Sequence, residues 1–178
     1  MLIGCRIRPL DESSNAVPEG HVGEIFSHTP WCFDGYWKLP EKTAEAFRGD
    51  YLSVGDMARR DEECFYYLVD RKTNMIISGS ENVYPSEVEN LLGAQPMVKD
   101  VAVIGRPDAK WGEAMHAVIV LREDAIATER KILEWCVDRI AGYKRPRSVS
   151  FLPEPDMPRT ATGKILHRVL RERLSRQG

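Results

Sequence analysis

The stretch Asp70-Arg-Lys-Thr-Asn-Met-Ile-Ile-Ser-Gly-Ser-Glu-Asn-Val-Tyr-Pro-Ser-Glu-Val-Glu89 decides the fold. A charged segment leads into an apolar strand at Met75–Ile77, and a loop of small polar residues, Ser78–Asn82, separates this strand from a helix at Ser86–Leu92. Small side chains let the backbone of the loop approach a narrow ligand. An ordinary strand-to-helix turn would have the same composition, so both interpretations stay open.

Two signals compete for the start of this helix. Ser86 and Glu89 have the spacing of a capping box, in which each side chain satisfies a backbone amide of the first turn. Pro85 favours a start one residue earlier, because proline is preorganised for the first helical position.

Residues 74–178 alternate between apolar strands and amphipathic helices. The apolar periodicity predicts three further strands and two further helices, which are Val98–Ile104, Ala114–Leu121, Ser148–Leu152, Thr128–Ile140 and Lys164–Leu174. The pattern indicates a small sheet with packed helices.

Residues 1–69 have a different pattern of secondary structure, in which short strands are joined by turns. We expect two strands, one short helix and a hairpin, which are Met1–Leu10, Val22–His28, Pro40–Phe47 and Tyr51–Arg59 with Phe65–Val69. The whole chain is therefore predicted to be α+β, with a boundary at Asp70–Thr73.

Composition and charge restrict the class of protein. Of the 178 residues 43% are hydrophobic and 29% charged, and no apolar run has the length of a membrane span. Residues 139–178 contain ten Lys/Arg and three Asp/Glu, which gives a formal net charge of +7. The first 138 residues have a formal net charge of −9. The basic C-terminal quarter is suited to binding a partner that carries phosphates. A helix face that is merely solvated would have the same charge. The four cysteines lie far apart, without the spacing of a metal site, so we expect free thiols in the cytoplasm.

Two further patterns carry chemistry. Ser53-Val-Gly-Asp56 places a carboxylate after a glycine, where it can accept two hydrogen bonds from a vicinal diol such as ribose; turn chemistry alone also explains it. Pro158-Arg-Thr-Ala-Thr-Gly-Lys164 delivers one lysine on a donor-rich loop, although a solvated lysine is the simpler interpretation. The loop lacks the spacing of a Walker motif.

Taken together, these segments resemble the C-terminal part of the adenylate-forming enzymes, the acyl-CoA synthetase and ligase superfamily. Gly20-His-Val-Gly-Glu-Ile25 and Gly35-Tyr-Trp-Lys-Leu-Pro-Glu-Lys-Thr43 extend the resemblance upstream, and the motifs are most similar to those of fatty-acyl or aryl-CoA ligases. The resemblance implies that residues 1–69 are the end of the large N-terminal domain, a remnant of a β-barrel subdomain. It also implies that residues 70–73 are a hinge linker and residues 74–178 a C-terminal lid domain.

The resemblance also implies a reaction and its residues. Such enzymes join a carboxylic acid to ATP, with Mg²⁺, and then transfer the acyl group to coenzyme A. By resemblance Asp56 holds the ribose hydroxyls, Arg71 supports the same ribose or the linker, and Thr73 is the hinge residue. Lys164 would stabilise charge between the carboxylate and the α-phosphate, and no protein-bound metal is expected.

The coenzyme is implied to contact seven residues. The loop after the first strand of the lid would line the channel for the pantetheine arm. Aromatic side chains and a guanidinium would contact the nucleotide end of coenzyme A. These residues are Ser78, Gly79, Ser80, Glu81, Trp111, Tyr143 and Arg145. Simple packing is the alternative for Trp111 and Tyr143, and the four histidines are expected to be structural.

Four positions depart from the family pattern. Thr73 replaces the usual Asp or Lys of the hinge, and His167 replaces a common arginine. Ser80 stands where glycine is common, which narrows the implied channel. Cys64 stands where glycine is usual, so it is strained if the position keeps a positive φ.

The phosphate loop and acyl pocket of the family lie upstream of residue 1. We therefore expect this C-terminal fragment to be inactive without the missing N-terminal adenylation domain. The alternative is a non-catalytic module that binds nucleotide or coenzyme A; binding of nucleic acid through the basic tail is disfavoured. Strands of residues 1–69 that lack neighbours would favour a homo-oligomer.

Overall fold

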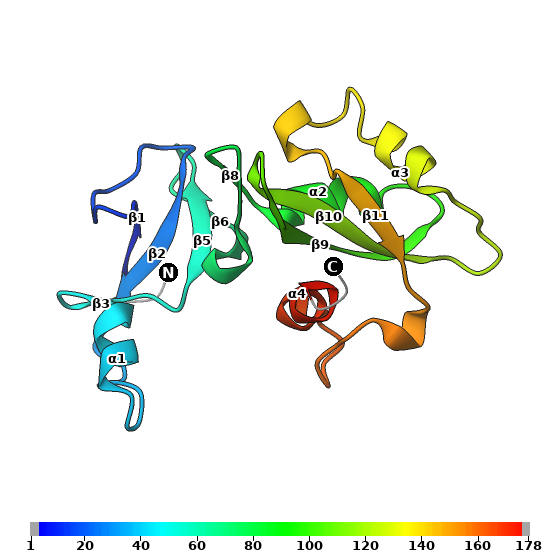
Figure 1. Cartoon of the computed structure of the whole chain (residues 1–178). Coiled ribbons are helices and arrows are strands. Elements are labelled where there is room, and N and C mark those ends of the chain that lie inside the picture. The colour runs from blue at the N-terminus through cyan, green and yellow to red at the C-terminus, as the bar shows by residue number, and fades with distance from the viewer. Residues whose placement is uncertain (1–3, 176–178) are drawn as a thin grey trace. The chain divides into compact units, whose positions relative to one another are not determined.

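The computed structural model describes residues 4–175 and divides them into two compact units, one up to Thr73 and one from Asn74 onward (Figure 1). The first unit is rich in strands, and the second is a sheet with packed helices. The predicted α+β class is confirmed. No helix among the described residues is long and apolar enough to cross a membrane.

The first unit is a six-stranded antiparallel sheet with one short helix. Its strands follow the order β3-β4-β2-β5-β6, and β1 pairs along β2. The elements are β1 (Arg6–Leu10), β2 (Val22–His28), α1 (Pro40–Ala46), β3 (Phe47–Arg48), β4 (Tyr51–Leu52), β5 (Asp56–Arg60) and β6 (Tyr66–Arg71). The expected strand at Met1–Leu10 begins at Arg6, and residues 1–3 lie outside the described residues.

The expected strand at Tyr51–Arg59 is in fact two strands, β4 and β5. The chain breaks between them because Gly55 takes a φ of +81°, which extended backbone does not allow. The hairpin of β5 and β6 forms as predicted, and its turn places Cys64 at a φ of +66°. The strain expected at this cysteine is therefore present.

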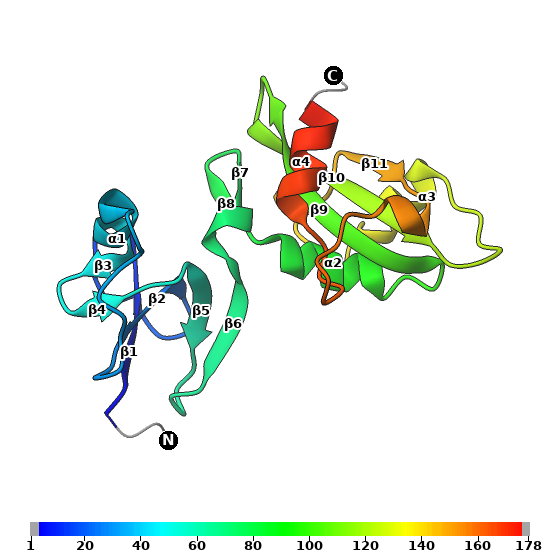
Figure 2. The same ribbon diagram turned by 90° about the horizontal axis from the view of Figure 1, so that it is seen from below.

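The second unit is built around β10. This strand pairs antiparallel with β9 and parallel with β11, and its first residue meets β7, which forms a hairpin with β8 (Figure 2). The strands are β7 (Ile76–Ser78), β8 (Glu81–Val83), β9 (Val98–Asp108), β10 (Gly112–Leu121) and β11 (Ser148–Phe151). The helices are α2 (Pro85–Gly93), α3 (Glu129–Trp135) and α4 (His167–Ser175), with short 3-10 turns η2 (Gly142–Lys144) and η3 (Glu154–Asp156). A further 3-10 turn, η1 (Lys72–Asn74), contains the boundary between the two units.

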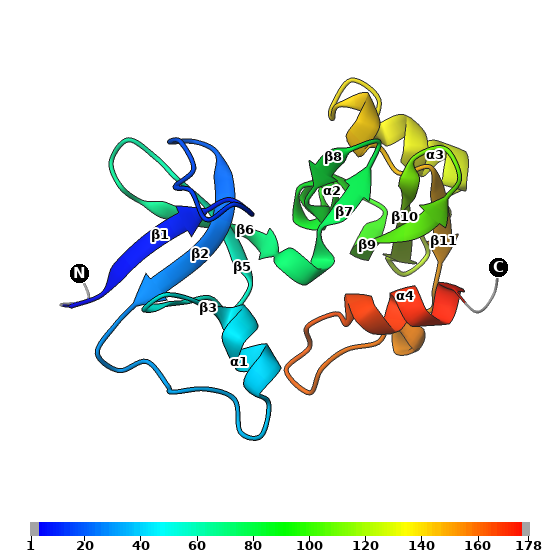
Figure 3. The same ribbon diagram turned by 60° about the vertical axis from the view of Figure 1, so that its left-hand side comes forward.

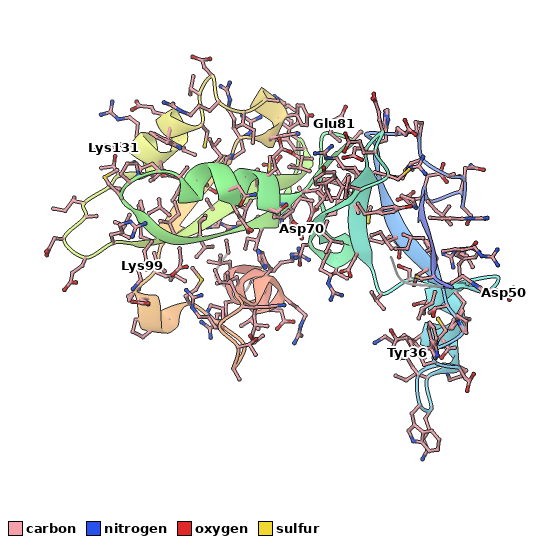
Figure 4. All side chains as sticks on the ribbon, turned by 180° about the vertical axis from the view of Figure 1, so that it is seen from behind. Tyr36, Asp50, Asp70, Glu81, Lys99 and Lys131 are labelled. Carbon is pink, nitrogen blue, oxygen red and sulfur yellow. The ribbon has the colours of Figure 1, made fainter. Side chains whose placement is uncertain are left out.

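Both faces of this sheet are covered, because side chains alternate along β10. Met115 and Ile119 belong to one fully buried core, which includes residues of α2 and α3. Val118 and Val120 belong to a second core on the other face, with Leu170 of α4. Figure 3 shows α4 on the opposite side of the sheet from α2 and α3. Near the start of β9, Lys99 (labelled in Figure 4) pairs at 2.6 Å with Glu154 of η3.

The helix starts decide two expectations. Helix α2 begins at Pro85 with Tyr84 as its N-cap, so the earlier start favoured by Pro85 is confirmed and Ser86 does not occupy the N-cap position that the capping box requires. Helix α4 begins at His167 rather than at Lys164, because Arg159 and Ile165 form a β-bridge that closes the intervening residues into a turn.

Helix α3 is shorter than the apolar pattern predicts. It starts where expected, since the hydroxyl of Thr128 accepts a hydrogen bond from the amide of Lys131. It ends at Trp135, and Asp138 three residues later has a φ of +61°, which a helix excludes.

Candidate functional site

The first unit brings Asp56 and Arg71 together. They are register partners at the start of β5 and the end of β6, and Arg71 Nε lies 2.8 Å from Asp56 Oδ1. Arg71 Nη1 also donates to the carbonyl oxygen of Val54 at 3.0 Å. Within residues 4–175 the second carboxylate oxygen of Asp56 has no hydrogen-bond partner, and the side chain is partly exposed. This oxygen can accept hydrogen bonds from hydroxyl groups of a ligand.

A network that the sequence analysis missed lies beside this pair. The carboxylate of Glu24 on β2 accepts hydrogen bonds from Ser53 Oγ at 2.6 Å and from Lys72 Nζ at 2.8 Å. Ser53 Oγ in turn accepts from the amide of Gly55, whose carbonyl accepts from the amide of Lys72. The backbone is therefore fixed to the first unit as far as Lys72, and Thr73 is the next residue along the chain.

Lys164 lies on a closed turn before α4, on the α4 side of the second unit. The amide of Thr160 donates to the carbonyl of Lys164 at 2.8 Å, and the amide of Gly163 donates to the carbonyl of Thr160 at 2.9 Å. The amide of Lys164 donates to Thr160 Oγ1 at 3.1 Å. The side chain of Lys164 is exposed, and its ammonium makes no ion pair or hydrogen bond with the described residues. A fixed backbone thus presents an available cation.

The residues predicted to form a loop at Ser78–Asn82 form a β-hairpin instead. Ser78 and Glu81 are paired in β7 and β8, and Gly79 and Ser80 make the two-residue turn with φ values of +61° and +69°. Two positive φ values in succession are typical of a type I′ turn, which matches the twist of a hairpin. Ser80, which stands where the family commonly has glycine, therefore has a backbone conformation that favours glycine.

Trp111 lies against this hairpin. The amide of Gly79 donates to the carbonyl of Trp111 at 2.9 Å, and a Cβ added to Gly79 would lie 2.9 Å from the indole Cε3. Lys110 Nζ and Arg147 Cζ lie 4.7 and 5.2 Å from the indole ring centroid. The indole is half-buried, so it both packs on Gly79 and keeps accessible surface among two cations.

Tyr143 and Arg145 lie on the segment that leads into Arg147 and β11. The Tyr143 side chain is exposed, and Lys144 Nζ lies 5.7 Å from its ring centroid. Arg145 is half-buried, and its Nε donates to the carbonyl of Ile140 at 3.0 Å. The structure thus joins Trp111 to the hairpin and to Arg147, whereas Tyr143 and Arg145 make their described contacts elsewhere.

Two histidines have partners far away in the sequence. His116 on β10 is 3% exposed, with Nδ1 2.7 Å from Ser148 Oγ and Nε2 2.8 Å from Ser150 Oγ of β11. Burial, and secondarily the charge of Arg106, lower the pKa of His116 to about 4, so its ring is neutral.

His167 on α4 contacts an acid on α2. Its Nε2 lies 2.6 Å from Glu89 Oε1, which also accepts a hydrogen bond from the amide of Val103 on β9 at 2.8 Å. Glu89 therefore links two helices to the sheet instead of capping α2. Among the described residues no three His, Cys, Asp or Glu side chains gather as a metal site.

Comparison with known proteins gives this arrangement a family. Residues 87–164 match the model of the AMP-binding enzyme C-terminal domain. The chain is 43% identical over 167 residues to a feruloyl-CoA synthase of Amycolatopsis sp, covering 94% of this chain and 34% of that protein. It is 43% identical over 159 residues to the long-chain-fatty-acid–CoA ligase FadD13 of Mycobacterium tuberculosis, covering 89% and 31%.

Solved structures agree with these relatives. ATP-bound MatB from Rhodopseudomonas palustris superposes with a TM-score of 0.90 at 36% identity, over 97% of this chain and 34% of that one. MenE from Bacillus subtilis, in complex with the acyl-adenylate intermediate OSB-AMP, gives 0.84 at 33% identity, over 95% and 34%. The chain therefore spans about one third of the length of the relatives it matches. Residues 87–164 therefore belong to the AMP-binding enzyme C-terminal domain family, and the chain as a whole is similar to one part of the acyl-CoA ligases.

Proposed function

We propose that this chain works as the C-terminal part of an ATP-dependent acid–CoA ligase. In the first half-reaction a carboxylate oxygen attacks the α-phosphorus of ATP, the bond to the β-phosphate breaks, and pyrophosphate leaves. In the second, the sulfur of coenzyme A attacks the acyl carbonyl carbon and displaces AMP. The relatives that are named as feruloyl-CoA synthase and fatty-acid–CoA ligase support this class of reaction.

The observation that carries the proposal is the presentation of Lys164. Its backbone is fixed by hydrogen bonds within the turn, whereas its ammonium is exposed and unpaired among the described residues. A preorganised cation stabilises the charge that develops as the carboxylate meets the α-phosphate, because it needs little reorganisation during the reaction. A lysine in a buried ion pair could not perform this task.

The nucleotide would be held by the first unit. Asp56 keeps one free carboxylate oxygen for the ribose hydroxyls, and Arg71 fixes the orientation of that carboxylate. Mg²⁺ would bind chiefly through the phosphates of ATP, which is its usual mode and requires no cluster of protein acids.

Coenzyme A would be held by the second unit. The Gly79–Ser80 turn offers little side-chain bulk, and Trp111 presents an aromatic surface beside Lys110 and Arg147. Ser78 and Glu81 complete the hairpin, while Tyr143 and Arg145 would contact the nucleotide end of the coenzyme. Thr73 would act as the hinge residue, because it directly follows the last residue that is fixed to the first unit.

Two further expectations follow from this assignment. A phosphate loop and an acyl pocket would have to come from another part of the enzyme, so this chain alone would not form an adenylate. ATP, a reduced coenzyme thiol and four free cysteines fit a reducing compartment, and the cytoplasm is our proposal.

The test separates the two half-reactions. The chain is fused to the part of the Amycolatopsis feruloyl-CoA synthase that precedes the matching region, and is called the fused ligase below. Adenylation is measured as pyrophosphate release from ATP and ferulate, and thioester formation is measured from synthetic feruloyl-adenylate and coenzyme A. We expect Lys164→Ala to slow adenylation on the order of 100- to 1000-fold and to leave thioester formation unchanged.

Lys131→Ala is the matched control, because it removes another exposed lysine of the second unit. Equal rates for Lys164→Ala and the parent in both half-reactions would contradict the proposal. So would steady pyrophosphate release by the unfused chain.

The second candidate is a module that binds nucleotide or coenzyme A without catalysis. The cations around Trp111 favour such binding even without a partner domain. Calorimetric titration of the chain with coenzyme A tests this candidate. Binding of coenzyme A by the chain, together with a fused ligase that is inactive in both half-reactions, would favour the binding module over the ligase.

A further inference from the structure

The turn that carries Lys164 is attached to the sheet by Arg159. One terminal nitrogen of its guanidinium, Nη1, donates to the carbonyl oxygen of Gly163 at 3.0 Å. The other, Nη2, lies 2.6 Å from Oδ2 of Asp100 on β9. Arg159 is also the β-bridge partner of Ile165, at the opposite end of the same turn. A single side chain therefore connects the residue before Lys164 to strand β9 of the sheet.

This contact differs from the surface ion pairs of the unit. The side chains of Arg159 and Asp100 are each 29% exposed, whereas Arg168, which pairs with Glu172 on α4 at 2.6 Å, is 81% exposed. Partial burial strengthens a charge-assisted hydrogen bond and reduces its screening by salt. The pair also has ordered surroundings, because the neighbouring Ile165 packs on the apolar cluster that includes Leu170.

The geometry needs an arginine. The planar guanidinium has donors that diverge in a fixed fork, so it can bind a backbone carbonyl and a carboxylate at the same time. A lysine has a single nitrogen at the end of its chain and cannot place two nitrogens on two separated acceptors. Hydrogen bonds within the turn close it locally, but only an outside contact sets its direction relative to the sheet.

We infer that Arg159 is a positioning residue, which holds the Lys164 turn in a fixed direction through Gly163 and Asp100. This inference rests on the proposed role of Lys164 in adenylation. Arg159 itself touches no reacting atom. Its loss leaves the ammonium present but lets the turn move, and a misplacement of about 1 Å can cost on the order of 100-fold in rate.

The first experiment uses the chain itself and measures amide hydrogen exchange. Arg159→Ala is expected to accelerate exchange about tenfold or more at the amides of Thr160, Gly163 and Lys164, since the turn opens more often. Exchange at core amides of β10 is expected to stay as in the parent chain. Arg168→Ala is the matched control, because it removes an exposed arginine from an ion pair that does not touch the turn. Unchanged exchange at all three turn amides in Arg159→Ala overturns the inference.

The second experiment measures both half-reactions in the fused ligase. Arg159→Ala is expected to lower the rate of adenylation about 10- to 100-fold, with little change in the KM for ATP and none in thioester formation. Arg159→Lys keeps the charge but not the fork, so it is expected to stay slow; full rescue by lysine overturns the inference. If Arg159→Ala does not fold, Asp100→Asn removes the charge of the same contact and is expected to slow adenylation selectively.

The two proposals fail in different ways. If Lys164→Ala leaves adenylation unchanged, the proposed function of Lys164 is wrong. If Lys164→Ala slows adenylation and Arg159→Ala does not, Lys164 is catalytic but Arg159 does not position it. A loss of both half-reactions in Arg159→Ala, with normal folding, also contradicts positioning, because it would indicate general damage to the second unit.

Discussion

Nδ1 of His116 lies 2.7 Å from the hydroxyl oxygen of Ser148, across the parallel pair of β10 and β11. The second ring nitrogen is bonded to Ser150 of the same strand, so the imidazole joins the two strands with both of its nitrogens. A neutral ring fits this arrangement, because it donates through one nitrogen and accepts through the other. A protonated ring would bury a charge without a carboxylate beside its nitrogens.

This histidine makes stability depend on pH. Burial lowers the pKa of His116 to about 4, whereas the ring in the unfolded chain has its usual pKa near 6.5. As the pH falls from about 6.5 to about 4, the unfolded state binds a proton that the folded state does not. The free energy of unfolding therefore decreases through this window, by up to about 3 kcal/mol from this residue.

Urea unfolding of the chain at several pH values from 7.5 to 4 measures this loss. His116→Gln should flatten the dependence, although it also lowers stability at neutral pH. His21→Gln, at an exposed histidine, should keep the full dependence. A parent chain whose stability does not change over this range would contradict the prediction.

Glycine at the strained turn positions should stabilise the fold. Ser80 and Cys64 have φ values of +69° and +66°, where a side chain costs about 1 to 2 kcal/mol. Part of the gain is lost because glycine adds entropy to the unfolded chain, so we expect Ser80→Gly and Cys64→Gly each to add about 0.5 to 1 kcal/mol.

Gly79→Ala is the opposite control, since an added Cβ meets Trp111 at 2.9 Å and φ is +61°. Thermal unfolding of the three variants measures these effects. The explanation by backbone strain would fail if Ser80→Gly and Gly79→Ala shifted the midpoint in the same direction.

Asp56 should affect nucleotide binding more than stability. Its ion pair with Arg71 is partly exposed, and pairs that solvent reaches contribute about 0 to 1 kcal/mol. In the fused ligase we expect Asp56→Ala to leave the unfolding midpoint nearly unchanged and to lower the affinity for ATP about tenfold. The loss should be much smaller for an ATP analogue that lacks both ribose hydroxyls, because that analogue cannot use the carboxylate. An equal loss for both nucleotides would exclude ribose binding by Asp56.

The edge of the first sheet should promote self-association. Strand β6 pairs with β5 on one side, and Leu68 in β6 is 71% exposed next to the exposed Phe65 and Tyr67. Exposed apolar side chains on a strand at the edge of a sheet favour association with a second copy of the chain. We expect the chain to form dimers at high concentration and Leu68→Lys to shift them to monomers. Sedimentation at several concentrations tests this, and a parent chain that stays monomeric would contradict it.

The sequence predicted local features of the fold better than contacts between distant segments. The apolar pattern at Val22–His28 gave a strand with the bounds observed, and Thr128 was correctly placed at the start of its helix. The hairpin of β7 and β8 was missed because Ser78–Asn82 lacks the apolar alternation of a strand. Its pairing depends on the type I′ turn of Gly79 and Ser80, which the composition did not distinguish from a loop.

For the candidate site, too, the sequence predicted individual residues better than the contacts that support them. Asp56, the Ser78–Glu81 residues and Lys164 lie in local motifs, whereas Trp111, Tyr143 and Arg145 were identified only by resemblance to the family, and all of their roles stay predictions. The supporting contacts were invisible, because Glu24 meets Lys72 48 residues later and Arg159 meets Asp100 59 residues earlier. In the sequence, Glu24 is only a glutamate that precedes an apolar strand residue. Its charge alone does not reveal which lysine it contacts.

The carboxylate of Glu89 has one more consequence. Strand β9 borders the sheet, and its Val103 amide donates to Glu89 rather than to another strand. With that donor occupied and α2 packed alongside, an intruding polypeptide cannot continue the ladder at this point. One acid thus occupies a backbone donor on the open side of a long apolar strand, where edge-to-edge pairing with another chain would otherwise begin.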